Sequence, residues 1–281
     1  MRYRRPGLDV FSHLLLILAV IAFLFPVWMA LTAATHSRTD LYTSIAPLWF
    51  GSEGLHNFIS VLTEPIPGVG ASASTMLLNS LVMSLGIAFG KIAISMLAAY
   101  AVVFFRFPGR ALCFWLIFMT LMLPVEVRIV PTYQVVADLH MLNSYPGMIL
   151  PLMASATATF LFRQFFLTVP PELLEAARVD GAGPWKFLWD ILLPLSKTNI
   201  AALFVIMFLY GWNQYLWPLM ITTDQSWTTV VVSLKQLASA SDALVPWQLV
   251  TAMALLALIP PVVVIIVMQR YFVKGLVDSE K

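Results

Sequence analysis

The sequence predicts an all-α polytopic membrane protein with six transmembrane helices and a helix-turn-helix loop on one side. Hydrophobic residues make up 60% of the 281 residues and charged residues 11%, whereas soluble domains are roughly a quarter charged. Long uncharged runs alternate with short polar stretches, and one stretch, residues 170–194, concentrates charge and turn residues between two such runs. We therefore expect a single transmembrane domain over residues 1–281.

The first two spans are predicted from the length of their apolar runs. Residues 14–34 carry no charge, and at about 1.5 Å per residue they are long enough to cross a bilayer. A cleavable signal peptide is the alternative, because Ala33 and Ala34 are small. Residues 35–75 mix Pro, Gly and polar residues and are expected to fold outside the membrane. The second span, residues 76–105, is long enough that it must either tilt or extend beyond the hydrocarbon.

The third expected span, residues 111–130, is interrupted near its end. Pro124, Glu126, Arg128 and Pro131 follow its apolar part. This combination indicates a broken or kinked helix that faces protein or water, because lipid does not tolerate unsatisfied backbone and charge.

Three further spans are expected at residues 146–166, 195–217 and 247–269. The fifth runs into Gly211–Pro218, a segment rich in aromatic and amide side chains. Aromatic residues often anchor a helix at the membrane interface. A belt needs no amides, so Asn213 and Gln214 favour a gate at the outer mouth, with the aromatic belt as the alternative.

The distribution of basic residues predicts that both termini are cytoplasmic. Three basic residues fall on the outer side in this orientation: Arg38, Arg128 and Lys235. The inner side holds Arg2, Arg4, Arg5, Arg106, Arg110, Arg163, Arg178, Lys186, Lys197, Arg270, Lys274 and Lys281. The stretch 170–194 is therefore expected to be cytoplasmic.

Within residues 170–194 we expect two short helices joined by a tight turn. Pro171 and Pro184 each suit a first helical position, and Asp180-Gly181 can reverse the chain. Apolar residues three and four apart give the first helix one apolar side, whereas Glu175 belongs to its polar surface. This pattern is typical of a docking element, although an ordinary amphipathic connector is the alternative.

The stretch also resembles the EAA loop of bacterial ABC importer permeases. Glu175-Ala176-Ala177, Asp180-Gly181, Ile191 and Leu193-Pro194 match that motif. The segments TLMLPVEVRIVP and GWNQYLWPL resemble the carbohydrate-uptake branch of the family. The resemblance implies a cytoplasmic coupling loop that docks on an ATPase, with these coupling positions: Glu175, Ala176, Ala177, Asp180, Gly181 and Pro194.

No nucleotide site is expected in this chain, so an enzymatic function is excluded. The nearest match to a phosphate-binding loop, Gly86–Lys91, has three residues between its glycines where four are needed, and Ile92 follows the lysine. Gly86 and Gly90 instead fit close helix packing. We expect no cofactor and no metal site, because Cys113 is the single cysteine and the four histidines are scattered. A net charge of +2 implies no nucleic-acid partner.

Lys91 is the anomaly, because it lies near the middle of the second span. An unpaired charge there costs at least about 2.5 to 3.5 kcal/mol, so its side chain must face protein or water. A structural pair with Glu126 is one interpretation, and a translocation path for anions is the other. The candidate path and gate residues are Lys91, Glu126, Arg128, Asn213 and Gln214.

The resemblance implies a transport subunit of the bacterial inner membrane. Its expected partners are membrane lipid, a homologous second permease subunit, two copies of a cytoplasmic ATPase and a periplasmic substrate-binding protein. Glycerol-3-phosphate is the expected solute, and a neutral sugar such as maltose is the alternative. A membrane scaffold that recruits a cytoplasmic partner without moving solute is a second class of function, but the intramembrane Lys91 favours transport.

Overall fold

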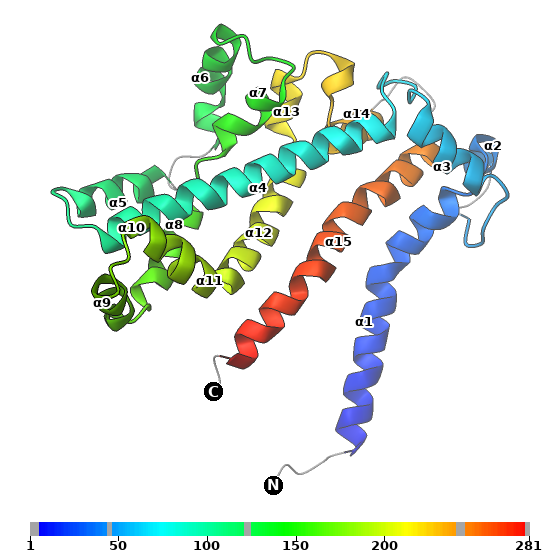
Figure 1. The fold of residues 1–281 in the computed structure, drawn as a ribbon. Coiled ribbons are helices and arrows are strands. Elements are labelled where there is room, and N and C mark those ends of the chain that lie inside the picture. Colours follow the sequence, from blue (N-terminus) through cyan, green and yellow to red (C-terminus); the bar gives the residue numbers. More distant parts are fainter. Residues whose placement is uncertain (1–5, 44–46, 121–124, 240–244, 279–281) are drawn as a thin grey trace. The chain divides into compact units, whose positions relative to one another are not determined.

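The computed structural model describes residues 6–43, 47–120, 125–239 and 245–278. Within these ranges the regular structure is helical throughout, so the predicted all-α class is confirmed (Figure 1). The chain divides into two compact units, residues 1–75 with 233–259 and residues 76–232 with 260–281. The helices α4, α14 and α15 each contribute to both units.

The first unit begins with a long helix whose surface is apolar. Side chains of this helix are widely exposed, with Phe23 81% accessible, as suits a helix surrounded by lipid. After it, Asn57 donates hydrogen bonds from Nδ2 to the carbonyls of Ala34 (3.0 Å) and His36 (2.9 Å), which tie α3 to the end of α1. The elements are α1 (Pro6–Ala33), α2 (Arg38–Thr43), α3 (Gly54–Thr63) and parts of α4 (Ala73–Phe104), α14 (Val230–Ala238) and α15 (Trp247–Asp278).

The second unit contains most of α4 and a series of shorter helices. In chain order they are α5 (Arg110–Met119), α6 (Val125–Asp138), α7 (Tyr145–Ile149), η2 (Leu150–Leu152), α8 (Ala156–Leu167), α9 (Pro171–Val179), α10 (Pro184–Lys186), η3 (Phe187–Leu192), α11 (Leu193–Leu195), α12 (Lys197–Trp212), α13 (Leu216–Ile221) and η4 (Gln225–Trp227). Helix α8 packs against both α5 and α12, and α13 packs against α6 and α7.

The core of the second unit joins α4 to α6, α7 and α13. Met83, Ile87, Met148 and Trp217 are among its fully buried members. The indole of Trp217 donates a hydrogen bond of 3.2 Å to the Gly147 carbonyl, so the one polar atom of this side chain is satisfied. Between membrane helices such packing stabilises the unit mainly through van der Waals contacts, because lipid is as apolar as the core.

The glycines of the second span lie at close packing contacts with side chains. A Cβ atom at Gly86 would overlap the Ile149 side chain, and one at Gly90 would overlap Met153. The expected contact was between helix backbones, whereas here side chains from the η2 region fill the grooves above the glycines. The close backbone approach occurs instead at Gly211, where a Cβ would lie 2.9 Å from the Ser84 Cα.

Three described helices are long and apolar enough to cross a membrane, and the number is five if each of two bent pairs counts as one span. The long helices are Val10–Ala33, Ala73–Phe104 and Trp247–Tyr271. The predicted number of six stays a prediction. The expected third span is divided between α5, which ends at Met119, and α6, which begins at Val125, while Pro124 lies outside the described residues.

The fourth expected span is bent, and the fifth begins at a bend that separates it from the preceding segment. Tyr145–Leu152 and Ala156–Leu167 meet at 51°, and Pro184–Leu195 and Lys197–Trp212 meet at 76°. At the first bend Ser155 starts a new helix by accepting a hydrogen bond from the Ala158 N–H, which is the usual role of an N-cap serine.

Candidate functional site

The segment resembling a coupling loop forms two helical pieces around a glycine turn. Pro171 and Pro184 stand in the first turn of α9 and α10, where a missing N–H costs no hydrogen bond. At the end of α9 the Asp180 N–H donates to the Ala176 carbonyl at 3.0 Å, and the Gly181 N–H donates to Arg178 at 3.1 Å.

The turn requires a left-handed backbone at Gly181. Its φ is +71°, and the following Ala182 N–H donates to the Ala177 carbonyl at 2.8 Å. Together these bonds form a Schellman motif, in which glycine is favoured because a Cβ strains this conformation. A Cβ at Gly181 would meet no atom within 4 Å, so the requirement lies in the backbone and not in neighbouring side chains.

The outer surface of this loop is exposed and mixes charge with large apolar side chains. Glu175 and Ala176 are exposed, whereas Ala177 is buried at 4% exposure. Trp185 and Trp189 are 65% and 58% exposed. Exposed aromatic side chains beside charge are typical of a protein interaction surface. Pro194 is also exposed and lies in α11, just before the bend into α12.

The inner side of the loop is anchored to the last turns of α4. The Tyr100 hydroxyl donates a hydrogen bond of 2.8 Å to the Pro184 carbonyl. The Phe187 ring lies 5.4 Å from Phe104 and 6.4 Å from Tyr100, measured between ring centroids. A pocket of about 820 Å³ lies beside this anchor and includes Glu175 in its lining. The loop is therefore held against α4 by aromatic contacts and one hydrogen bond.

Lys91 lies on the same helix and is sheltered by protein, as the sequence required. Its side chain is 6% exposed. The ammonium lies 3.7 Å from the centroid of the Tyr210 ring on α12. A cation over an aromatic face is stabilised by about 0.5 to 2 kcal/mol, more when it is desolvated.

Arg128 and Gln214, two other predicted path residues, belong to the same region. Arg128 directly precedes Ile129 of α6, a buried member of the core cluster against which Tyr210 packs. The Gln214 side chain donates from Nε2 to the Tyr210 carbonyl at 3.2 Å. Arg128 is exposed, whereas Lys91 is buried.

Asn213 and Glu126 are placed differently from these residues. Asn213 is exposed, and its Nδ2 donates to the Leu209 carbonyl at 2.9 Å. Both amides therefore satisfy carbonyls at the end of α12, where a helix leaves acceptors unpaired, and a gate stays a prediction. Glu126 is in the first turn of α6, but its side chain lies outside the described residues, so its pairing with Lys91 also stays a prediction.

Two tyrosines of these sites were missed by sequence reasoning. Tyr210 lies within an apolar run and Tyr100 within the second span. Each acts through a partner from a distant part of the chain, so no local spacing indicates either role. A tyrosine inside a span needs a partner for its hydroxyl, and this is the one signal that the sequence offers.

Comparison with known proteins places this architecture in a family. The family described as the binding-protein-dependent transport system inner membrane component matches residues 91–278. The chain belongs to this family. Its members are inner-membrane components of transport systems, so the chain is a permease subunit and its predicted class is confirmed.

Curated relatives of this permease cover the whole chain. The sn-glycerol-3-phosphate transport system permease protein UgpE of Yersinia enterocolitica is 57% identical over 277 residues, 99% of each chain. UgpE of Escherichia coli O1:K1 is 56% identical over 277 residues, again 99% of each chain. UgpE of Rhizobium meliloti is 53% identical over 279 residues, with the same coverage.

A solved structure supports the fold of the permease. A crystal structure of a bacterial ABC transporter involved in the import of the acidic polysaccharide alginate contains a chain with a TM-score of 0.81 and 20% identity. The match covers 97% of this permease and 99% of that chain. At this identity the likeness concerns the fold alone.

Proposed function

We propose that this permease forms one half of the path by which a binding-protein-dependent ABC importer moves sn-glycerol-3-phosphate into the cell. The observation that carries the proposal is the identity of 53 to 57% over 99% of relatives named as permeases for this solute. The scheme includes a homologous second permease, two copies of an ATPase and a periplasmic binding protein. Both termini lie in the cytoplasm.

The positive charges of Lys91 and Arg128 suit a phosphate ester. A phosphate monoester carries roughly −1.5 to −2 charges at pH 7. Lys91 supplies a buried positive charge and Arg128 an exposed one, and electrostatic attraction strengthens as water is excluded. A neutral sugar would gain nothing from this arrangement. These two residues therefore favour an anionic solute over maltose.

The coupling loop supplies the mechanical part of the function. In the proposed cycle, ATP binding moves the partner ATPases, the exposed face of α9 follows them, and the Tyr100 anchor transmits the motion to α4. The spans then alternate between inward and outward access to the solute. ATP hydrolysis takes place in the separate ATPase subunits.

The proposal is tested by uptake into proteoliposomes that contain the assembled transporter and ATP. With the glycerol-3-phosphate binding protein outside, labelled glycerol-3-phosphate is expected to accumulate only with ATP. Maltose is expected to stay at the background level. Accumulation of maltose with no uptake of glycerol-3-phosphate would refute the solute, and absence of any uptake by an assembled complex would favour a scaffold.

A further inference from the structure

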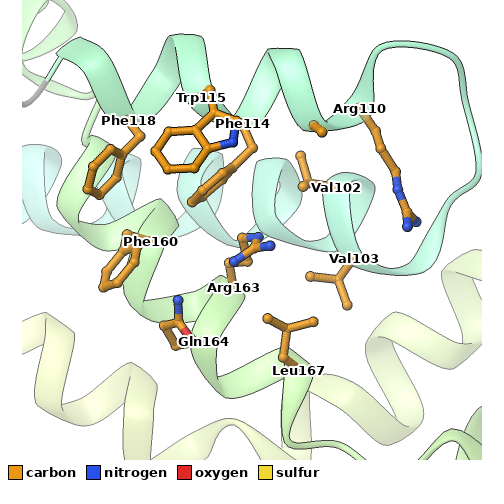
Figure 2. Close-up of a pocket in the computed structure, with 11 residues that line it drawn as sticks. Val102, Val103, Arg110, Phe114, Trp115, Phe118, Phe160, Arg163, Gln164 and Leu167 are labelled. Atoms are coloured by element: carbon orange, nitrogen blue, oxygen red, sulfur yellow. The ribbon is translucent and has the colours of Figure 1, made fainter.

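A smaller pocket of the second unit belongs neither to the Lys91 region nor to the face of the coupling loop. It has a volume of about 360 Å³, within the range of small-ligand sites. Figure 2 shows that it lies between the end of α4, the length of α5 and the second half of α8. Its lining consists of Val102, Val103, Arg110, Ala111, Phe114, Trp115, Phe118, Phe160, Arg163, Gln164 and Leu167.

Arg163 occupies the middle of this pocket (Figure 2). Its guanidinium carbon lies 4.2 Å from the centroid of the Phe114 ring. Its Nε atom is buried and has no hydrogen-bond partner among the described residues. A buried donor on a charged group is costly when it is left unsatisfied, so the pocket is suited to an acceptor that reaches Arg163.

The charge of the lining is entirely positive. Arg110 is exposed at one end of the pocket, where its Nη1 makes only a long contact of 3.5 Å with the Phe105 carbonyl. None of the eleven lining residues, all of them described, is acidic. Arginine forks match the oxygen atoms of phosphate groups in particular. An anion with phosphate oxygens is therefore the complementary ligand.

The pocket changes from basic to aromatic along its length. Arg110 opens α5, whereas Phe118 lies eight residues later, about 12 Å along the helix axis. Phe118 and Phe160 face each other at that end, with ring centroids 5.5 Å apart. A basic end followed by an aromatic end matches a ligand with an anionic head and a hydrocarbon tail.

We propose that this pocket binds an anionic phospholipid, with its phosphodiester at Arg163 and Arg110 and an acyl chain along Phe118 and Phe160. A free phosphate offers the same oxygen atoms but leaves the aromatic end uncovered. Basic pockets between spans on the cytoplasmic side are the usual sites for such headgroups. The assignment to the cytoplasmic leaflet rests on the orientation in the proposed function, whereas lipid binding itself does not.

The position of the pocket gives the lipid a route to the coupling loop. Helix α8 ends at Leu167, a lining residue, and α9 begins at Pro171. Arg110, Val103 and Leu167 also line the larger pocket beside the loop anchor. A lipid held at Arg163 therefore stabilises the end of α8 from which the coupling loop starts.

Native mass spectrometry of the assembled transporter tests this site. The wild-type complex is expected to retain phosphatidylglycerol in preference to phosphatidylcholine. Arg163→Gln is expected to weaken phosphatidylglycerol binding about tenfold, as loss of a charge-assisted hydrogen bond implies, and Arg163→Lys is expected to restore part of it. The matched control is Arg106→Gln, which removes the same charge from the connection between α4 and α5 and does not line this pocket.

Three results would overturn the site. They are equal binding of both lipids by the wild type, unchanged phosphatidylglycerol binding in Arg163→Gln, or displacement of the lipid by millimolar inorganic phosphate or glycerol-3-phosphate, which would indicate a free-anion site. If Arg163→Gln does not assemble, the exposed Arg110→Gln replaces it and is expected to reduce the lipid preference in the same direction. Lipid binding is measured without uptake, so failure here leaves the proposed solute unaffected.

Discussion

Two places along α4 differ in whether the charge beside them is exposed or buried. Near its end, Tyr100 anchors a loop whose Glu175 is exposed to solvent. Nine residues earlier, about 14 Å along the same helix, Lys91 is 6% exposed and lies against Tyr210. An exposed charge suits a partner that binds and releases, whereas a buried cation attracts an anion strongly because little water screens it. We therefore propose that the two regions divide the work between docking, by α9 and its Tyr100 anchor, and recognition, by Lys91 beside Tyr210.

The largest expected effect comes from the turn of the docking region. Gly181→Val places a β-branched residue at φ +71°, which costs at least about 1 to 2 kcal/mol and favours another loop conformation. Uptake of glycerol-3-phosphate is expected to fall to background although the protein inserts normally. The measurement is uptake together with membrane abundance.

Gly181→Asn is the matched control, because asparagine tolerates the left-handed region and a side chain there meets open space. It is expected to keep most of the uptake. Full uptake with normal ATPase activity in Gly181→Val would show that the turn is not needed.

The next effect concerns the recognition region. Lys91→Met keeps the length of the side chain and removes its charge, so uptake is expected to drop about tenfold with the complex intact. Lys91→Arg is expected to restore part of it. The measurements are membrane abundance and uptake, made together.

A structural pair with Glu126 makes a different prediction for the same variant. Removing Lys91 would then leave a carboxylate unpaired, lower the abundance, and be corrected by adding Glu126→Gln. Recovery of abundance in that double variant would contradict the path assignment.

The sequence predicted the structure of the docking region more fully than that of the recognition region. The signals for the docking region lie close together in the chain. Asp180-Gly181 and the two prolines specify a helix end, a reversal and a new start within fifteen residues of chain from Pro170 to Pro184. The need to shelter Lys91 was also predictable, because hydropathy alone places it within a span.

The sequence did not predict that Tyr210 covers Lys91, because the two residues meet only when α4 and α12 pack together. Gly211, which allows close approach to Ser84, is the residue beside Tyr210, yet nothing local in the sequence pairs it with α4. The amides of Asn213 and Gln214 show the converse difficulty. Polar residues at the end of a span suggested a gate, whereas in the structure both side-chain amides donate hydrogen bonds to backbone carbonyls of α12.

A smaller effect is expected from the hydrogen bond that ties the loop to α4. Tyr100→Phe removes the hydroxyl that donates to Pro184 but retains the ring contacts. Loss of one such hydrogen bond costs about 0.5 to 1.5 kcal/mol, so uptake is expected to decrease between about twofold and tenfold. Tyr42→Phe is the control, since it removes a similar bond of 2.7 Å to the Val245 carbonyl in the other unit. Equal losses in both variants would argue against a special role for the anchor.

The smallest effect is expected on the exposed face of α9. Glu175→Lys reverses a charge on the docking surface, and an exposed ion pair contributes about 0.2 to 1 kcal/mol. The affinity for the ATPase is expected to fall a few-fold, and the difference should shrink at high salt. Glu172→Lys, also exposed on this helix, is the control. Unchanged assembly of the Glu175 variant at low salt would count against this contact.

The division of work between the two regions is tested most directly by the amount of glycerol-3-phosphate moved per ATP hydrolysed. In proteoliposomes with the loaded binding protein, Lys91→Met is expected to keep stimulated ATP hydrolysis while moving about tenfold less solute, so the ratio falls. Gly181→Val is expected to lose the stimulation itself. A wild-type ratio in Lys91→Met, or stimulated hydrolysis with normal uptake in Gly181→Val, would contradict the account.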